Sequence, residues 1–72
     1  MIRNQVYERR VLARLTQEEL AGRVGVTRQT IIALEKHKYV PSVELCFKLA
    51  RVFDTKVDEL FSYEPLASGR VE

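Results

Sequence analysis

The chain has 72 residues, a formal net charge of +2, and a composition that is 46% apolar and 31% charged. This length allows one domain with one small core, and the composition is typical of a folded protein rather than a disordered tail. Cys46 is the only cysteine, which excludes an internal disulfide, and a zinc site would lack ligands because His37 is the only histidine. We therefore expect neither a bound metal nor a cofactor.

The charges are unevenly distributed along the chain. Residues 1–40 hold eight basic and four acidic side chains, whereas residues 41–72 hold four basic and six acidic ones. Residues 1–40 are therefore the part of the chain that we expect to face phosphate groups. The longest segment without Lys, Arg, Asp or Glu is Gln29–Leu34, six residues, and the first ten residues lack a signal-peptide pattern. We expect a cytoplasmic protein that makes no contact with a membrane.

Helix signals recur at short intervals, and no segment alternates apolar and polar residues long enough to predict a strand. The sequence therefore predicts an all-α fold. Five helices are expected: about Asn4–Ala13, Gln17 to a stop at Gly25, about Arg28 to Glu35 or Lys36, a fourth capped by Ser42, and about Val57–Phe61. Apolar residues at three- and four-residue spacing should face the core: Ile31 and Leu34 in the third helix, and Leu45, Cys46, Leu49, Ala50 and Phe53 in the fourth.

The second and third helices should meet at a sharp corner. Thr16 and Glu19 have the spacing of a capping box, in which each side chain bonds the backbone N–H of the other. Gly25 can adopt the left-handed conformation that ends a helix without a steric penalty. Only Gly25 and Val26 precede Thr27, a good N-cap residue, so the next helix follows after a very tight turn.

The segment LTQEELAGRVGVTRQTIIALEKHK, residues 15–38, resembles the helix-turn-helix of the phage-repressor and Cro proteins, also called the XRE family. The resemblance covers roughly residues 4–63 and rests on these positions: Leu15, Gln17, Leu20, Ala21, Gly25, Val26, Ile31, Leu34 and Glu35. It implies a compact five-helix bundle of the lambda-repressor-like DNA-binding type, with the helix-turn-helix at the second and third helices. It also implies a small transcriptional regulator, with repression favoured, that binds a two-fold symmetric operator in double-stranded DNA as a homodimer.

The resemblance makes the third helix the recognition helix, which enters the major groove with its N-terminal residues first. Arg28 and Gln29 match positions that meet base edges: Arg28 would donate to guanine O6 and N7, and Gln29 would bond adenine N6 and N7. Ala33 also matches a base-contact position, where it could touch only a thymine methyl group. Ile32 would do the same or would close the edge of the core. The alternative for Arg28 and Gln29 is a solvated helix surface.

Four residues are candidates for phosphate contacts. Gln17 opens the second helix, where backbone N–H groups and the helix dipole attract anions, and the resemblance places a phosphate-contacting Gln there. Thr27, Lys36 and Lys38 are expected to contact phosphates around the recognition helix. For the two lysines, a solvated surface charge is the competing interpretation.

Two further positions of the family pattern concern the anchoring of the recognition helix. Arg10 and Glu35 match residues that form an ion pair in some relatives, between the first helix and the end of the recognition helix. The alternative is two solvated charges.

Three residues depart from the family pattern. Arg14 and His37 occupy positions where the family commonly has Gly, so each is expected at a helix end with positive φ, at a cost of about 1 kcal/mol. Lys56 stands where the family usually has a Ser or Thr cap for the fifth helix. That helix should therefore start irregularly or use Thr55.

The residue content of the chain also bears on other classes of function. An enzyme is not expected, because the chain offers one His, one Cys and no glycine-rich phosphate loop. An antitoxin or an adaptor, acting mainly through protein–protein contacts, remains the alternative. The domain is expected over residues 1–63, with 64–72 as a tail that frays or joins a dimer, and no small-molecule effector is expected. Four apolar residues near the end are the candidate dimer surface: Leu60, Phe61, Tyr63 and Leu66.

Overall fold

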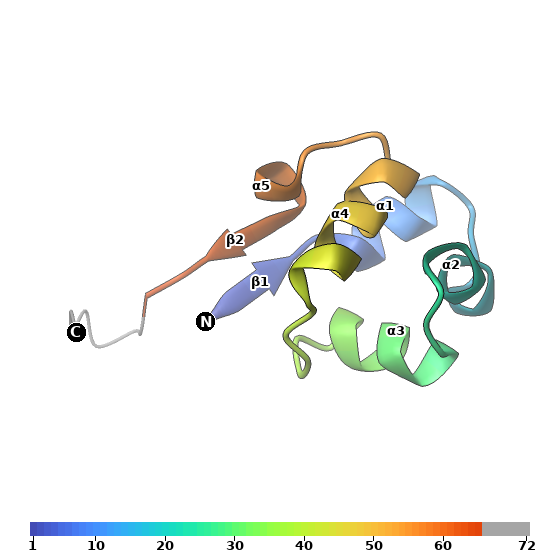
Figure 1. Ribbon diagram of the computed structural model, residues 1–72, viewed down its shortest axis with the longest axis horizontal. Helices are drawn as coiled ribbons and strands as arrows, with labels where there is room; N and C mark the ends of the chain where they lie inside the picture. Colours follow the sequence, from blue (N-terminus) through green and yellow to red (C-terminus); the bar gives the residue numbers. More distant parts are fainter. Residues whose placement is uncertain (66–72) are drawn as a thin grey trace.

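The computed structural model describes residues 1–65 of the chain. Its elements follow in the order β1 (Ile2–Asn4), α1 (Val6–Leu12), α2 (Gln17–Val24), α3 (Arg28–Glu35), α4 (Val43–Val52), α5 (Val57–Leu60) and β2 (Phe61–Tyr63). The five helices gather into one body, from which the two paired strands extend (Figure 1). Among residues 1–65, no helix has the length and hydropathy needed to cross a bilayer.

The starts of α2, α3 and α4 follow from local capping, as the sequence predicted. Thr16 Oγ1 accepts from Glu19 N at 3.0 Å, and Glu19 Oε1 accepts from Thr16 N at 2.8 Å, so the capping box at the start of α2 is confirmed. Thr27 and Ser42 cap α3 and α4 in the predicted way. Lys56 caps α5 without a side-chain hydrogen bond, which agrees with the irregular start expected there.

One apolar core joins all five helices. The predicted core residues Ile31, Leu34, Leu45, Leu49 and Ala50 are buried, whereas Cys46 and Phe53 are partly buried and pack against the core. The other buried residues come from both ends of the chain and from α2: Val6, Leu20, Ala21, Val24, Leu60 and Phe61. Burial also raises the pKa of the Cys46 thiol, which agrees with a packing role for this side chain.

The two-stranded sheet is a departure from the all-α prediction. Ile2 pairs with Tyr63 and Asn4 with Phe61 in antiparallel register, so α1 begins at Val6 rather than Asn4 and α5 ends one residue before Phe61. The pairing is extended by the backbone of Met1, whose carbonyl accepts from Glu64 N at 2.8 Å. Each strand has three residues, and its partner lies at the other end of the chain. Local periodicity carries no signal for such a short non-local pair.

The expectation that Leu60 and Phe61 form a dimer surface is wrong. Leu60 is 1% and Phe61 9% exposed, because both pack into the core of their own chain. Tyr63 is exposed, and Leu66 lies outside the described residues.

Three helices end through a left-handed residue that is not glycine. Arg14, His37 and Asp54 have φ of 59°, 60° and 53°, which confirms the positive φ expected for Arg14 and His37. At each site the residue and its successor donate backbone hydrogen bonds to the last turn of the helix, for example Arg14 N to Val11 O and Leu15 N to Arg10 O. This pattern is the Schellman motif, in which glycine is the least strained residue.

Replacing Arg14 by Gly is therefore expected to stabilise the protein. Relief of the left-handed strain outweighs the added freedom of glycine in the unfolded chain, for a net gain of about 0.5–1 kcal/mol. Thermal denaturation followed by circular dichroism should show a rise in Tm of roughly 2–8 °C. As a matched control, Gly25→Ala should lower the stability by about 1 kcal/mol, because Gly25 has φ 75°. A lower Tm for Arg14→Gly would contradict the strain argument.

Candidate nucleic-acid interface

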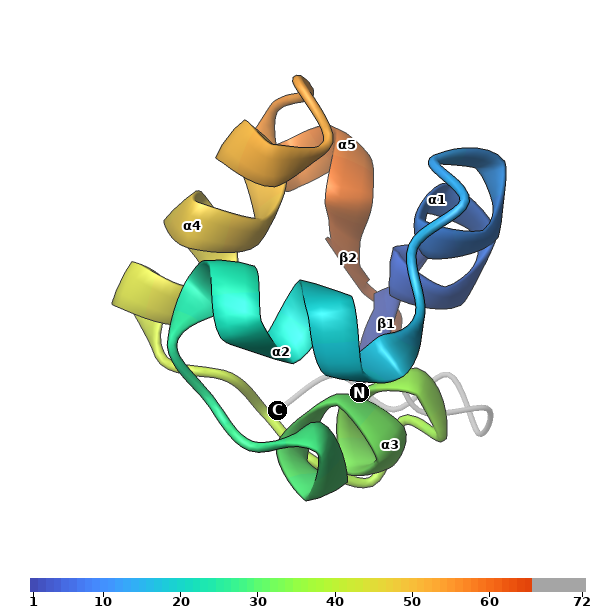
Figure 2. The same ribbon diagram turned by 90° about the vertical axis from the view of Figure 1, so that its right-hand side faces the viewer.

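Helices α2 and α3 meet at the corner that the sequence predicted. Gly25 ends α2 in the left-handed conformation, with φ 75° and ψ 32°, and its N–H donates to Ala21 O. Val26 N donates to the same carbonyl at 3.0 Å, and Thr27 then caps α3. Figure 2 shows α3 beneath α2, at the edge of the molecule, so one side of α3 packs on the body while the other faces outward.

The first turn of α3 lies on the surface. Arg28 and Gln29 are exposed, whereas Ile32 and Ala33 are half-buried. A half-buried Ile32 is compatible with both roles considered for it, a base contact and closure of the core edge. Two long polar side chains, with smaller apolar ones behind them, are therefore the groups that α3 presents to a ligand.

The N-cap of α3 is held by two hydroxyl groups. Thr27 Oγ1 accepts from Thr30 N at 3.3 Å and lies 3.1 Å from Thr30 Oγ1. When Thr30 donates its hydroxyl proton in this pair, the hydroxyl proton of Thr27 stays available for an outside acceptor. Thr27 therefore can cap the helix and contact an anion at the same time.

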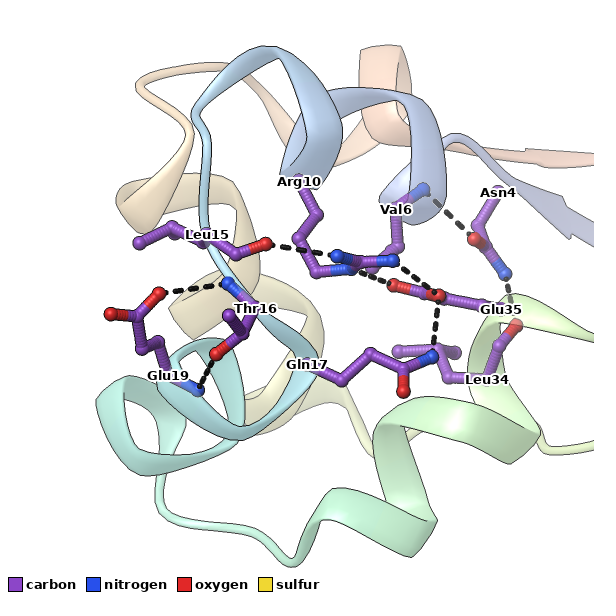
Figure 3. Close-up of polar contacts among 9 residues, drawn as sticks. All are labelled: Asn4, Val6, Arg10, Leu15, Thr16, Gln17, Glu19, Leu34 and Glu35. Carbon is purple, nitrogen blue, oxygen red and sulfur yellow. Dashed lines mark hydrogen bonds and ion pairs between the residues drawn. The ribbon is translucent and has the colours of Figure 1, made fainter.

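The structure brings Arg10 and Glu35 together in a two-point ion pair (Figure 3). Arg10 Nε lies 2.6 Å from Glu35 Oε2, and Arg10 Nη2 lies 3.2 Å from Glu35 Oε1. The two side chains are only 13% and 6% exposed, so water screens the pair weakly. The hydrogen bond to Glu35 raises the pKa of Arg10 despite the opposing effect of burial. The pair joins α1 to the last turn of α3.

Two more groups complete this network. Arg10 Nη1 donates to Leu15 O at 2.9 Å, and Gln17 Nε2 donates to Glu35 Oε1 at 3.1 Å (Figure 3). Gln17, the candidate phosphate contact, therefore also binds α2 to the end of α3. Its amide nitrogen carries a second hydrogen, which a phosphate oxygen can accept.

Asn4 is a positioning residue that the sequence analysis missed. Its Oδ1 accepts from Val6 N at 2.9 Å, and its Nδ2 donates to Leu34 O at 3.0 Å (Figure 3). The amide nitrogen also lies 3.5 Å from His37 Nδ1. The backbone partners fix the orientation of the amide, because Val6 N needs an acceptor and Leu34 O needs a donor. Asn4 therefore attaches the end of α3 to the start of α1.

The surface around α3 is positively charged. Between Leu20 and Val43 the sequence contains four Arg or Lys residues, and Glu35 is the only carboxylate. Because Glu35 is buried against Arg10, its charge is neutralised at the site itself. The exposed cations of this stretch are Arg23, Arg28, Lys36 and Lys38. Such a surface favours a polyanion.

The candidate phosphate contacts lie at both ends of α3. A hollow of about 550 Å³ lies between the starts of α2 and α3 and is lined by Arg10, Thr16, Gln17, Glu18 and Arg28. At the other end, Lys36 follows the last residue of α3, and Lys38 N donates to Ala33 O at 2.9 Å. Glu18 is the one acidic side chain in the hollow, and it opposes an anion there. Within residues 1–65, no group of three His, Cys, Asp or Glu side chains is arranged to hold a metal ion.

The geometry of α2, the turn at Gly25 and α3 defines a helix-turn-helix domain. The sequence profile of the helix-turn-helix family matches residues 6–60, which is most of the chain. The chain belongs to this family, as its resemblance to phage-repressor and Cro proteins indicated.

Curated proteins of archaea and bacteria are similar to the chain over most of its length. An uncharacterized HTH-type transcriptional regulator of Methanocaldococcus jannaschii is 51% identical over 63 residues, which cover 88% of this chain and 96% of that protein. The HTH-type transcriptional regulator YgzD of Bacillus subtilis is 43% identical over 63 residues, with the same shares covered. The cryptic phage CTXphi transcriptional repressor RstR of Vibrio cholerae is 36% identical over 62 residues, covering 86% of this chain and 56% of the repressor.

Loss of Arg10 should destabilise the fold strongly. In Arg10→Met, the carboxylate of Glu35 stays buried without its cation, at an expected cost of about 3–5 kcal/mol. The double variant Arg10→Met/Glu35→Gln should lose less than the sum of the two single variants, with a coupling of about 1.5 kcal/mol or more. Urea denaturation of the four proteins measures this cycle. A loss below about 1 kcal/mol in Arg10→Met would show that solvent already screens the charge.

Loss of Asn4 should loosen the end of α3. Asn4→Ala leaves Val6 N and Leu34 O without their partners, at a cost of about 1–3 kcal/mol. Asn4→Asp keeps the acceptor for Val6 N but turns an oxygen toward Leu34 O, so it should not restore stability. Urea denaturation, with amide hydrogen exchange at His37 and Lys38, measures both variants. Full stability of Asn4→Asp would mean that the bond to Leu34 is dispensable.

Proposed function

We propose that the protein is a small transcriptional regulator that binds a specific sequence in double-stranded DNA as a homodimer on a two-fold symmetric operator. The observation that carries this proposal is the exposed first turn of α3, set in a surface whose only carboxylate between Leu20 and Val43 is buried and neutralised. An α-helix fits the major groove, and the surrounding cations compensate the phosphate charge. Repression is the favoured role, since one relative is named as a transcriptional repressor.

Base contacts are assigned to the outward side of α3. Arg28 and Gln29 are exposed in its first turn, and each can make two hydrogen bonds to one base, Arg28 to guanine and Gln29 to adenine. Ala33 and Ile32, further along the helix and half-buried, can offer only apolar contact to a thymine methyl group. Specificity should therefore rest mainly on the two polar residues.

Phosphate contacts are assigned to both ends of α3. Gln17 and Thr27 lie near the two helix starts. Gln17 keeps one amide hydrogen beyond its contact with Glu35, and Thr27 keeps its hydroxyl hydrogen when Thr30 is the donor in their pair. Lys36 and Lys38 follow the end of α3 and are exposed. Contacts at both ends would fix α3 along the groove, because phosphate contacts set the register without identifying the sequence.

The remaining assignments follow from this role. Residues 1–63 are assigned to the DNA-binding domain, and of the predicted tail, residues 64–72, the part from Leu66 onward lies outside the described residues. The protein works without catalysis, a cofactor or a small-molecule effector. Regulation acts through protein level, dimerisation or a protein partner.

Selection of bound fragments from random double-stranded DNA, followed by gel shift, tests the proposal. The selected fragments should share a two-fold symmetric site with nanomolar-to-micromolar Kd at a stated salt concentration. In Gln29→Ala, affinity for this site should fall by about 5- to 150-fold while random DNA is bound as before. Gln5→Ala, an exposed glutamine at the start of α1, is the matched control and should bind like the wild type.

Phosphate contact has a separate signature. Lys38→Ala should weaken binding to the selected site and to random DNA alike, and it should reduce the slope of log K against log salt by about 0.9. Failure of the wild type to prefer any duplex over random DNA would remove the regulator proposal in favour of an antitoxin or adaptor.

A further inference from the structure

The connection between α3 and α4, residues 36–42, is fixed at both of its ends. At the first end, Lys38 N donates to Ala33 O at 2.9 Å, which ties the chain to the last turn of α3. At the other end, Ser42 caps α4, and Pro41 holds the residue before it in an extended conformation. A side chain in the middle of this connection therefore keeps a constant position relative to α3.

Tyr39 is the large side chain in the middle of the connection, and it is 41% exposed. It lines a hollow of about 210 Å³ together with Gly25 and Val26 of the turn before α3 and with Ser42 at the start of α4. Within residues 1–65, the Tyr39 hydroxyl makes no hydrogen bond. A tyrosine whose ring borders the protein while its hydroxyl is free is typical of an interface.

Tyr39 and Gln17 lie on different sides of α3. The hollow beside Tyr39 is formed by the turn and the start of α4, whereas Gln17 shares a separate hollow with Arg10 and Thr16. In Figure 2, the start of α2 lies to the right of α3, and the connection from α3 to α4 passes to the left. A helix in the major groove, which is about 12 Å wide, lies between two phosphate backbones. The two side chains are therefore placed to meet different backbones.

We propose that the Tyr39 hydroxyl donates a hydrogen bond to a DNA phosphate on the opposite side of the groove from the phosphate bound by Gln17. This inference rests on the proposed function and adds an uncharged ligand to the predicted phosphate contacts. Tyrosine is among the side chains that bond phosphate oxygens in protein–DNA complexes. The rest of the connection offers less, since Val40 and Pro41 have apolar side chains and the Ser42 oxygen already caps α4.

This contact differs in its salt dependence from the contacts predicted for the lysines. A lysine that neutralises a phosphate releases a counterion, so its contribution to binding falls as the salt concentration rises. The hydroxyl of Tyr39 is neutral at pH 7 and releases none. Its contribution should therefore persist at salt concentrations that weaken the contacts of Lys36 and Lys38.

The variant Tyr39→Phe tests the contact, because it keeps the ring and removes only the hydroxyl. In gel shifts over a series of salt concentrations, its Kd for the selected site and for random duplex DNA should rise about 2- to 10-fold for each copy bound. The slope of log K against log salt should equal that of the wild type. Tyr63→Phe is the matched control, since it removes the same group from β2 at a position 68% exposed, and it should bind like the wild type.

Thermal denaturation of Tyr39→Phe separates a DNA contact from a structural role. The variant should keep the Tm of the wild type, because the hydroxyl has no partner within residues 1–65. A lower Tm, or a loss of affinity confined to the selected site, would overturn the phosphate contact in favour of a structural role or a base contact. Binding of Tyr39→Phe equal to that of the wild type would overturn this inference and leave the DNA-binding proposal intact. If the wild type prefers no duplex over random DNA, the proposed function fails, yet the two proteins can still be compared on random DNA.

Discussion

The orientation of α3 depends on the ion pair between Arg10 and Glu35. Helix α3 contributes few fully buried apolar side chains to the core, and apolar packing has no preferred direction. The two bonds between the guanidinium and the carboxylate do have one, since hydrogen bonds weaken steeply when they are bent. Through Leu15 O and Gln17 the same network reaches the α1–α2 connection and α2. Burying the pair costs the free energy of removing both charges from water. Here the pair fixes the direction of α3, which apolar packing in a small core does not fix.

Local signals predicted most of this fold. The capping box of Thr16 and Glu19, the left-handed Gly25 and the cap at Ser42 each depend on residues a few positions apart, so the sequence displays them directly. The exposure of Arg28 and the burial of Ile31 follow from helical periodicity in the same way. The strands β1 and β2 and the role of Asn4 were missed, because their partners lie about 30 to 60 residues away in the chain.

The fate of the apolar residues shows a second limit of sequence analysis. From the sequence, Leu60 and Phe61 were expected to lie on the surface. In the structure, β2 pairs with β1, and Gln5 N donates to Leu60 O at 3.0 Å. The core therefore absorbs both side chains. Phe47 belongs to a helix whose apolar face is wider than the surface available to cover it, and it stays outside. Which apolar side chains remain exposed depends on the topology of the fold. Composition alone does not determine that topology.

The pairing of β1 with β2 has a consequence for synthesis on the ribosome. Asn4 lies in β1 opposite Phe61, and it is also one of the groups that hold the end of α3. The segment β1, which helps to anchor α3, is thus synthesised before α3, whereas its strand partner β2 follows α3 in the chain. A nascent chain that has completed α2 and α3 still lacks β2, the strand that pairs with β1, so the anchoring of the end of α3 through Asn4 should be complete only after β2 has been translated.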